Sequence, residues 1–149
     1  MRCPIHEVYM QIKELEPGFS ICHAIHPADM ADIKARGFQA IICNRMPGEA
    51  EDHDDDALLR QAAAASGLAW REIPVVPGDY TAEAIEAFGQ ALETLPTPIL
   101  AFCRTGRRAA SLWVHSQAQK TGCDIGALLQ AAHTAGHDVS DQHGRVTGG

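Results

Sequence analysis

Residues 103–108 (Cys-Arg-Thr-Gly-Arg-Arg) place a thiol, a glycine and three arginines in six consecutive positions. Nearby cations stabilise the thiolate, the nucleophilic form of cysteine. Glycine permits the backbone torsions that turn successive N–H groups inwards to make an anion-binding nest. We therefore predict that Cys103 is a nucleophile and that Arg108 clamps a tetrahedral anion with paired hydrogen bonds. The intervening anion-binding loop consists of Arg104, Thr105, Gly106 and Arg107.

Arg104 and Arg107 also have a simpler interpretation. The chain carries a formal net charge of −7, so loop cations can serve only to balance an acidic surface. Contact with substrate and exposure to solvent both remain open for these two side chains.

Asp79 is the candidate general acid. It lies in a Pro-Gly-Asp-Tyr turn that should follow a strand at the same end of the sheet as Cys103. Hydrolysis of a phosphate ester requires such an acid to protonate the leaving oxygen. The alternative is that Asp79 only shapes the turn or caps the helix near Thr81.

Strand-like and helix-like segments alternate along the chain. The predicted strands are Gly18–His23, Phe38–Cys43, Leu68–Val76 and Ile99–Phe102. The predicted helices are Pro27–Arg36, a helix capped by the aspartates that end at Asp56 and running to about Ala65, Thr81–Leu95, Arg108–Lys120 and Asp124–Ala135. This alternation predicts a three-layer α/β fold, with a mainly parallel central sheet of four to five strands flanked by helices. Cys103 then lies at the carboxyl end of a strand, where such folds bind ligands.

Other residues near strand ends are secondary candidates. Arg45 and Glu49 follow the second predicted strand and are candidate rim residues of the same site, or else they form a local ion pair. Cys22 and Cys43 either approach Cys103 as resolving thiols or are simply buried apolar side chains.

The bulk composition limits the remaining possibilities. A chain of 149 residues suits one domain, with a core from about residue 12 to residue 138 and frayed ends. The acidic charge and the absence of a Lys/Arg run argue against nucleic-acid binding. No apolar run is long enough for a membrane span, and no secretory leader is visible, so a cytoplasmic location is expected. His23, His26 and Cys22 do not complete a metal cluster, and no metal or cofactor is expected.

Four stretches of this sequence resemble one known family. Phe38–Glu49, Gly67–Val75, Pro98–Arg108 and Leu112-Trp113 are similar to the phosphatase-like domain of beta-lactamase-hydrolase-like proteins. The resemblance covers roughly Ile12 to Asp138, and the arginine-rich loop is its most specific part. It implies a protein-tyrosine/dual-specificity-phosphatase-like fold with Cys103 as nucleophile and Arg108 as anion binder. Family members have been labelled both phosphatases and sulfur transferases, so the resemblance leaves the reaction open.

Details of the loop divide the two reactions. Tyrosine phosphatases usually have a histidine before the cysteine and five residues between cysteine and arginine. Here Phe102 takes the place of the histidine, and four residues separate Cys103 from Arg108. Ala109 follows the arginine, so no hydroxyl is present there to ease departure of the thiolate. The shorter loop resembles that of rhodanese-type sulfurtransferases. In a sulfur-transfer reaction of this chain, Cys103 would carry a persulfide.

We expect a cysteine-dependent phosphatase that cleaves phosphate monoesters through a cysteinyl-phosphate, with sulfur transfer as the close alternative. The expected partner is a phosphorylated or sulfane-sulfur-bearing small molecule or protein. A second alternative is a non-catalytic module that binds an anionic or phosphorylated protein, for which Cys103→Ser would leave function unaffected. The oligomeric state is not indicated by the sequence.

Overall fold

A five-stranded sheet occupies the middle of the computed structural model, which describes residues 12–46, 56–76, 78–119 and 124–137. The strands run in the order β1-β2-β5-β3-β4. Their bounds are Lys13–Glu16 (β1), Phe19–Cys22 (β2), Ala40–Cys43 (β3), Ala69–Glu72 (β4) and Ile99–Phe102 (β5). β2, β5, β3 and β4 are parallel, whereas β1 pairs antiparallel with β2. The four parallel strands are those predicted, and β1 was not predicted.

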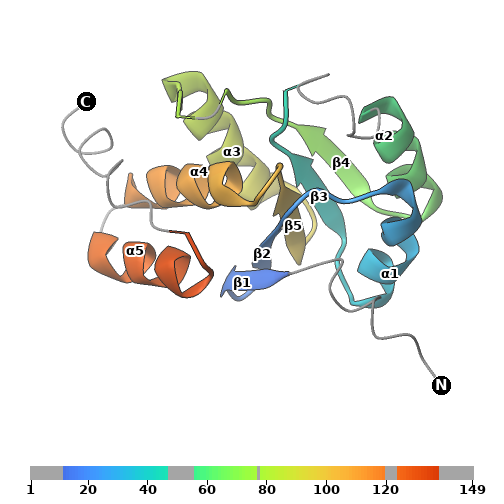
Figure 1. Ribbon diagram of the computed structural model, residues 1–149, viewed down its shortest axis with the longest axis horizontal. Coiled ribbons are helices and arrows are strands. Elements are labelled where there is room, and N and C mark those ends of the chain that lie inside the picture. Colours follow the sequence, from blue (N-terminus) through green and yellow to red (C-terminus); the bar gives the residue numbers. More distant parts are fainter. Residues whose placement is uncertain (1–11, 47–55, 77, 120–123, 138–149) are drawn as a thin grey trace.

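Helices cover both faces of the sheet (Figure 1). A short 3-10 turn, η2 (Pro27–Asp29), leads into α1 (Met30–Ala35), and α2 (Asp56–Ala65) lies beside it on one face. The other face carries α3 (Ala82–Thr94), α4 (Arg107–Ala118) and α5 (Ile125–Thr134). The predicted three-layer α/β architecture is confirmed.

Period-two alternation explains how each strand serves both layers. In β5, Ile99 and Ala101 pack in the core beneath α3, α4 and α5, whereas Leu100 and Phe102 pack in the core beneath α1 and α2. All four residues of β5 are buried. A strand covered on both faces must be apolar throughout, which is why β5 and β3 read as continuous apolar runs.

The helix ends follow from local side-chain chemistry. Thr81 caps α3, because its side-chain oxygen accepts a hydrogen bond from the Ala84 N–H at 3.1 Å. Ile85, Phe88 and Ala91 are the buried residues of that helix. α4 is buried from Arg108 to Gln117, which places it at the centre of the three-helix layer.

The strand register lines up the residues that carry the site. Cys22 of β2 and Cys43 of β3 both lie opposite Phe102 of β5. Because these strands are parallel, the residues that follow them leave the sheet at one common edge. Cys103, which follows Phe102, is therefore at the middle of the carboxyl edge.

Candidate active site

Cys103 lies at the junction between β5 and α4. Only residues 104–106 separate it from the first residue of the helix, which begins at Arg107. The side chain is buried, with 1% of the residue exposed. Its Sγ accepts a hydrogen bond from the Gly106 N–H at 3.1 Å. The sulfur is thus held against the N-terminal end of a helix, where unpaired N–H groups favour a negative charge.

Gly106 gives the loop its shape. It is the N-cap residue of α4 and has a φ of +97°, in the left-handed region that favours glycine. This torsion turns the chain so that its N–H points at the Cys103 sulfur. The glycine is thus required by conformation at the position where the sequence predicted it.

The other loop residues are tied down by main-chain contacts. The carbonyl of Arg104 accepts a hydrogen bond from the Ala24 N–H at 3.2 Å, which links the loop to the segment after β2. The Thr105 hydroxyl accepts from the Arg107 N–H at 3.3 Å. The side chains of Arg104 and Thr105 are exposed, and that of Arg107 is half-buried. Arg104 also lines a pocket of about 400 Å³ together with His23, Ala24 and His26.

Arg108 connects the start of α4 to two other strand ends. Its residue exposure is 5%, and its Nη1 donates to the Val75 carbonyl at 2.9 Å and to the Asn44 carbonyl at 3.3 Å. These carbonyls follow β4 and β3, so the guanidinium lies at the same carboxyl edge as Cys103. The anion-clamping role of Arg108 stays a prediction.

Asn44 is a site residue that the sequence analysis did not single out. Its backbone N–H donates to the Phe102 carbonyl, its Nδ2 donates to the Ile73 carbonyl, and its carbonyl accepts from Arg108. The side chain is fully buried, and Oδ1 has no hydrogen-bond partner within the described part of the chain. A polar residue directly after a continuous apolar strand was the available signal.

Arg45 is not at the rim of the site, contrary to one of its two predicted roles. Its side chain is 2% exposed, its Nη2 pairs with Asp56 Oδ1 at 3.3 Å, and its guanidinium carbon lies 5.3 Å from the centre of the Phe102 ring. Its burial against the Phe102 ring and its pair with Asp56 favour a structural role over contact with substrate. Glu49, the other candidate rim residue, lies outside the described residues.

Asp79 lies in an exposed turn after β4. Its N–H donates to the Val76 carbonyl at 2.9 Å, and Thr81, not Asp79, caps α3. The turn leaves the same sheet edge as Cys103, because β4 and β5 are both parallel to β3. At the usual strand spacing, two strand positions amount to about 10 Å across the sheet. The role of Asp79 as general acid stays a prediction.

Cys22 and Cys43 are core residues. They pack with Phe102 in the cluster beneath α1 and α2. Burial raises the pKa of the Cys43 thiol to about 12, so it stays protonated at neutral pH. None of the cysteines that the structure describes takes part in a disulfide. Their interpretation as buried apolar side chains is confirmed.

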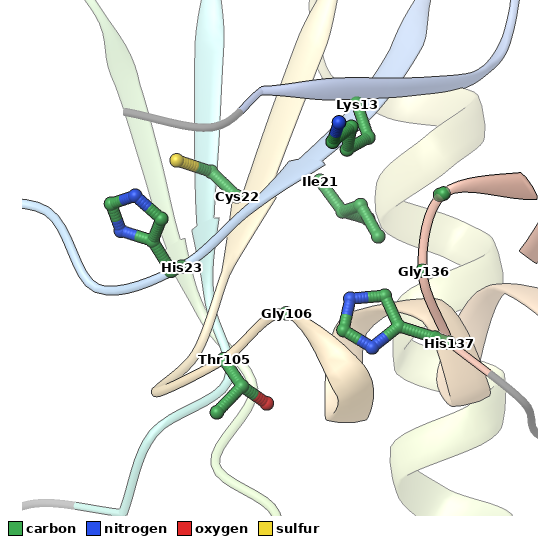
Figure 2. A pocket seen from close by; sticks show the side chains of 9 residues that line it. Lys13, Ile21, Cys22, His23, Thr105, Gly106, Gly136 and His137 are labelled. Carbon is green, nitrogen blue, oxygen red and sulfur yellow. The ribbon is translucent and has the colours of Figure 1, made fainter. Parts of the chain in front are cut away.

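A pocket of about 350 Å³ adjoins the loop on the β2 side (Figure 2). The segment that follows α5 forms its far wall, where the Nε2 of His137 lies 3.1 Å from the position that a Cβ on Gly106 would occupy. Burial lowers the pKa of His137, and the Arg107 guanidinium lowers it further. The pocket is lined by Lys13, Ile21, Cys22, His23, Thr105, Gly106, Ala135, Gly136 and His137. Scattered histidines gave no sequence signal for this convergence.

Gly106→Ala should lower both stability and any activity that depends on Cys103. Alanine would adopt a φ near +97° and place its Cβ 3.1 Å from His137 Nε2 and 3.4 Å from the Cys22 carbonyl oxygen. The strain should cost roughly 1–3 kcal/mol in denaturant unfolding. Gly37→Ala is the control, because Gly37 has a φ of +102° but no atom within 4 Å of an added Cβ. Equal losses in the two variants would show that the contacts around Gly106 have no effect.

Within residues 12–46, 56–76, 78–119 and 124–137, no group of three or more His, Cys, Asp or Glu side chains is placed to hold a metal ion. In the same part of the chain, no helix combines the length and the apolar character needed to cross a bilayer.

Comparison with known sequences identifies relatives of this chain. The family model for the "Beta-lactamase hydrolase-like protein, phosphatase-like domain" matches residues 11–120. A beta-lactamase hydrolase-like protein of Agrobacterium fabrum is 34% identical over 91 residues, which cover 61% of this chain and 21% of the relative. The chain spans between a fifth and a quarter of the length of the curated relatives it matches.

Solved structures show the same fold. A candidate phosphatase from Neisseria meningitidis superposes with a TM-score of 0.83 at 29% identity, covering 93% of this chain and 98% of its own. A kinase-associated phosphatase with serine in place of its catalytic-site cysteine has a TM-score of 0.64 at 13% identity, covering 86% of this chain and 83% of its own. At that identity the likeness concerns the fold alone. The chain belongs to the family of phosphatase-like domains of beta-lactamase hydrolase-like proteins and has the fold of the protein-tyrosine and dual-specificity phosphatases.

Proposed function

We propose that this domain hydrolyses phosphate monoesters with the thiolate of Cys103 as nucleophile. The hydrogen bond of 3.1 Å from the Gly106 N–H to Cys103 Sγ carries the proposal. It joins the nucleophile to the N-terminus of α4, where backbone donors stabilise both a thiolate and the oxygens of a bound phosphoryl group. Membership of a phosphatase-like family supports the same reaction.

The reaction proceeds in two displacements. The Cys103 thiolate attacks phosphorus, the P–O ester bond breaks, and the leaving oxygen takes a proton from an acid for which Asp79 is the candidate. Water then attacks the cysteinyl-phosphate and gives a proton to the Asp79 carboxylate. The S–P bond breaks, which releases orthophosphate and restores the thiolate. Loop N–H groups and Arg108 neutralise charge on the equatorial oxygens.

Loop length supports sulfur transfer as a second candidate. α4 begins only four positions after Cys103, and a short loop encloses less space than a phosphoryl group ordinarily requires. In this reaction the thiolate attacks the outer sulfur of thiosulfate, the S–S bond breaks, and sulfite leaves. Cyanide then removes the outer sulfur of the Cys103 persulfide as thiocyanate and restores the thiolate.

A single quench experiment separates the two reactions. The protein is mixed with an aryl phosphate, or with thiosulfate, stopped in acid and analysed by peptide mass spectrometry. We expect one phosphoryl group on the peptide that contains Cys103, release of orthophosphate, and no thiocyanate when cyanide is added to the thiosulfate sample. A Cys103 peptide heavier by one sulfur atom, together with formation of thiocyanate, would contradict phosphate hydrolysis and support sulfur transfer. Anion binding without either product would favour a non-catalytic module.

A further inference from the structure

The pocket beside the loop is assembled from three parts of the chain that are distant in sequence. β1 supplies Lys13, the loop supplies Thr105 and Gly106, and the segment after α5 supplies His137. Ile21 of β2 lies between them, and Figure 2 shows its side chain directed towards Gly136 and His137. The His137 backbone is anchored by its N–H, which donates to the Ala132 carbonyl at 2.9 Å. The pocket walls are therefore held by regular structure.

The described side chains that line this pocket are cationic or neutral. Among the described residues that line it, none is Asp or Glu. Lys13 lies opposite Ile21 in the β1–β2 pair, so both side chains share the face that carries α4 and α5. Strand alternation directs Glu14 to the other face. Arg107 at the start of α4 adds a second cation close enough to His137 to lower its pKa.

The pocket is adjacent to the reactive sulfur. Gly106 lines it, and the N–H of the same residue donates to Cys103 Sγ. One residue, Gly106, thus borders both the sulfur and the pocket that contains Lys13 and Thr105. Groups of this kind recognise anions, because a lysine ammonium and a threonine hydroxyl both donate to oxygen.

We propose that this pocket is a subsite for a second anionic group of the substrate, so that the preferred substrates are phosphate monoesters carrying a further phosphate or carboxylate. Lys13 supplies the charge, and Thr105 and His137 supply hydrogen bonds. That the bound molecule is a substrate rests on the proposed phosphatase function, but anion binding at the pocket is measurable without turnover.

Substrate preference tests the subsite. Phenyl phosphate has one anionic group, whereas phenylene bisphosphate and carboxyphenyl phosphate carry a second. Lys13→Gln removes one charge-assisted hydrogen bond, so it should raise KM about ten-fold for the two substrates that carry a second anionic group. It should leave their kcat, and both KM and kcat for phenyl phosphate, within about two-fold. Comparing the bisphosphate with the carboxylate shows which anion the pocket favours.

Arg71→Gln is the matched control. Arg71 is an exposed cation on β4, at the opposite edge of the sheet from β1, so the variant loses the same charge away from the pocket. It should leave the ratio between substrates unchanged. Equal effects of Lys13→Gln on all three substrates, or an equal change with Arg71→Gln, would overturn the subsite.

Binding to the Cys103→Ser protein provides a readout independent of catalysis. Among the described residues, Lys13 on β1 and His23 after β2 line this pocket together with His137, and Arg107 on α4 lowers the pKa of His137. A bound anion stabilises the imidazolium, so phenylene bisphosphate should move the NMR titration of His137 to higher pH. This shift should be lost in Lys13→Gln. A shift in a protein that turns over no phosphate ester would retain the anion site and reject the phosphatase function; an unmoved titration at saturating bisphosphate would reject the site.

Discussion

Cys103→Ser should reduce kcat for an aryl phosphate by at least about a thousand-fold. A serine hydroxyl is almost entirely protonated at neutral pH and is a much weaker nucleophile than a thiolate. The substitution changes one buried atom, so the loop and its Gly106 N–H donor should be retained. The measurement is steady-state phosphate release at saturating substrate, with the melting temperature recorded to show that the variant is folded.

Cys43→Ala is the matched control for a lost thiol. Cys43 is fully buried at the end of β3, and its high pKa keeps it protonated. Its removal should lower stability by about 1 kcal/mol and leave kcat within a few-fold. Full activity of Cys103→Ser would contradict nucleophilic catalysis and favour the non-catalytic module. An equal loss in Cys43→Ala would indicate damage to the fold.

Arg108→Met should have the second-largest effect, because it acts on stability and on turnover together. The carbonyls of Asn44 and Val75 accept hydrogen bonds from Arg108 Nη1 in a buried setting. The Asn44 carbonyl keeps the hydrogen bond that it accepts from the Val75 N–H at 3.2 Å, whereas the Val75 carbonyl loses its donor from Arg108. An unsatisfied buried carbonyl costs about 1–3 kcal/mol, so the free energy of unfolding should fall by about that amount. Turnover should fall by about a hundred-fold, since transition-state charge loses its guanidinium partner.

Arg108→Lys separates the two contributions. Lysine keeps the charge and can donate to one or both carbonyls, but it lacks the planar guanidinium that binds two oxygens in parallel. We expect much of the stability and little of the turnover to return, as measured by urea unfolding and kcat in the same preparation. A lysine variant with both properties restored would show that Arg108 is not a bidentate anion clamp. Arg71→Met, an exposed substitution on β4, controls for loss of an arginine.

The sequence determined the layered architecture. Apolar runs such as Ile99–Phe102 are readable because a strand covered on both faces is buried at every position. The same reasoning placed Cys103 between a strand and a helix, since the end of one periodic pattern and the start of the next are local features. The role of Gly106 could also be predicted from the sequence, because a positive φ is a local property that a single glycine allows.

Tertiary structure decided which distant residues meet at that junction. β1 escaped prediction because only Leu15 of its four residues is buried, so Lys13–Glu16 shows no strand-like apolar pattern. Arg45, a candidate rim residue from the sequence, is buried in the structure and pairs with Asp56. The contacts of Arg108 with Asn44 and Val75, and the pocket shared by Lys13, Gly106 and His137, depend on β5 lying between β2 and β3. Periodicity reports how deeply each segment is buried, but the neighbours of Cys103 follow from strand order, which long-range packing sets.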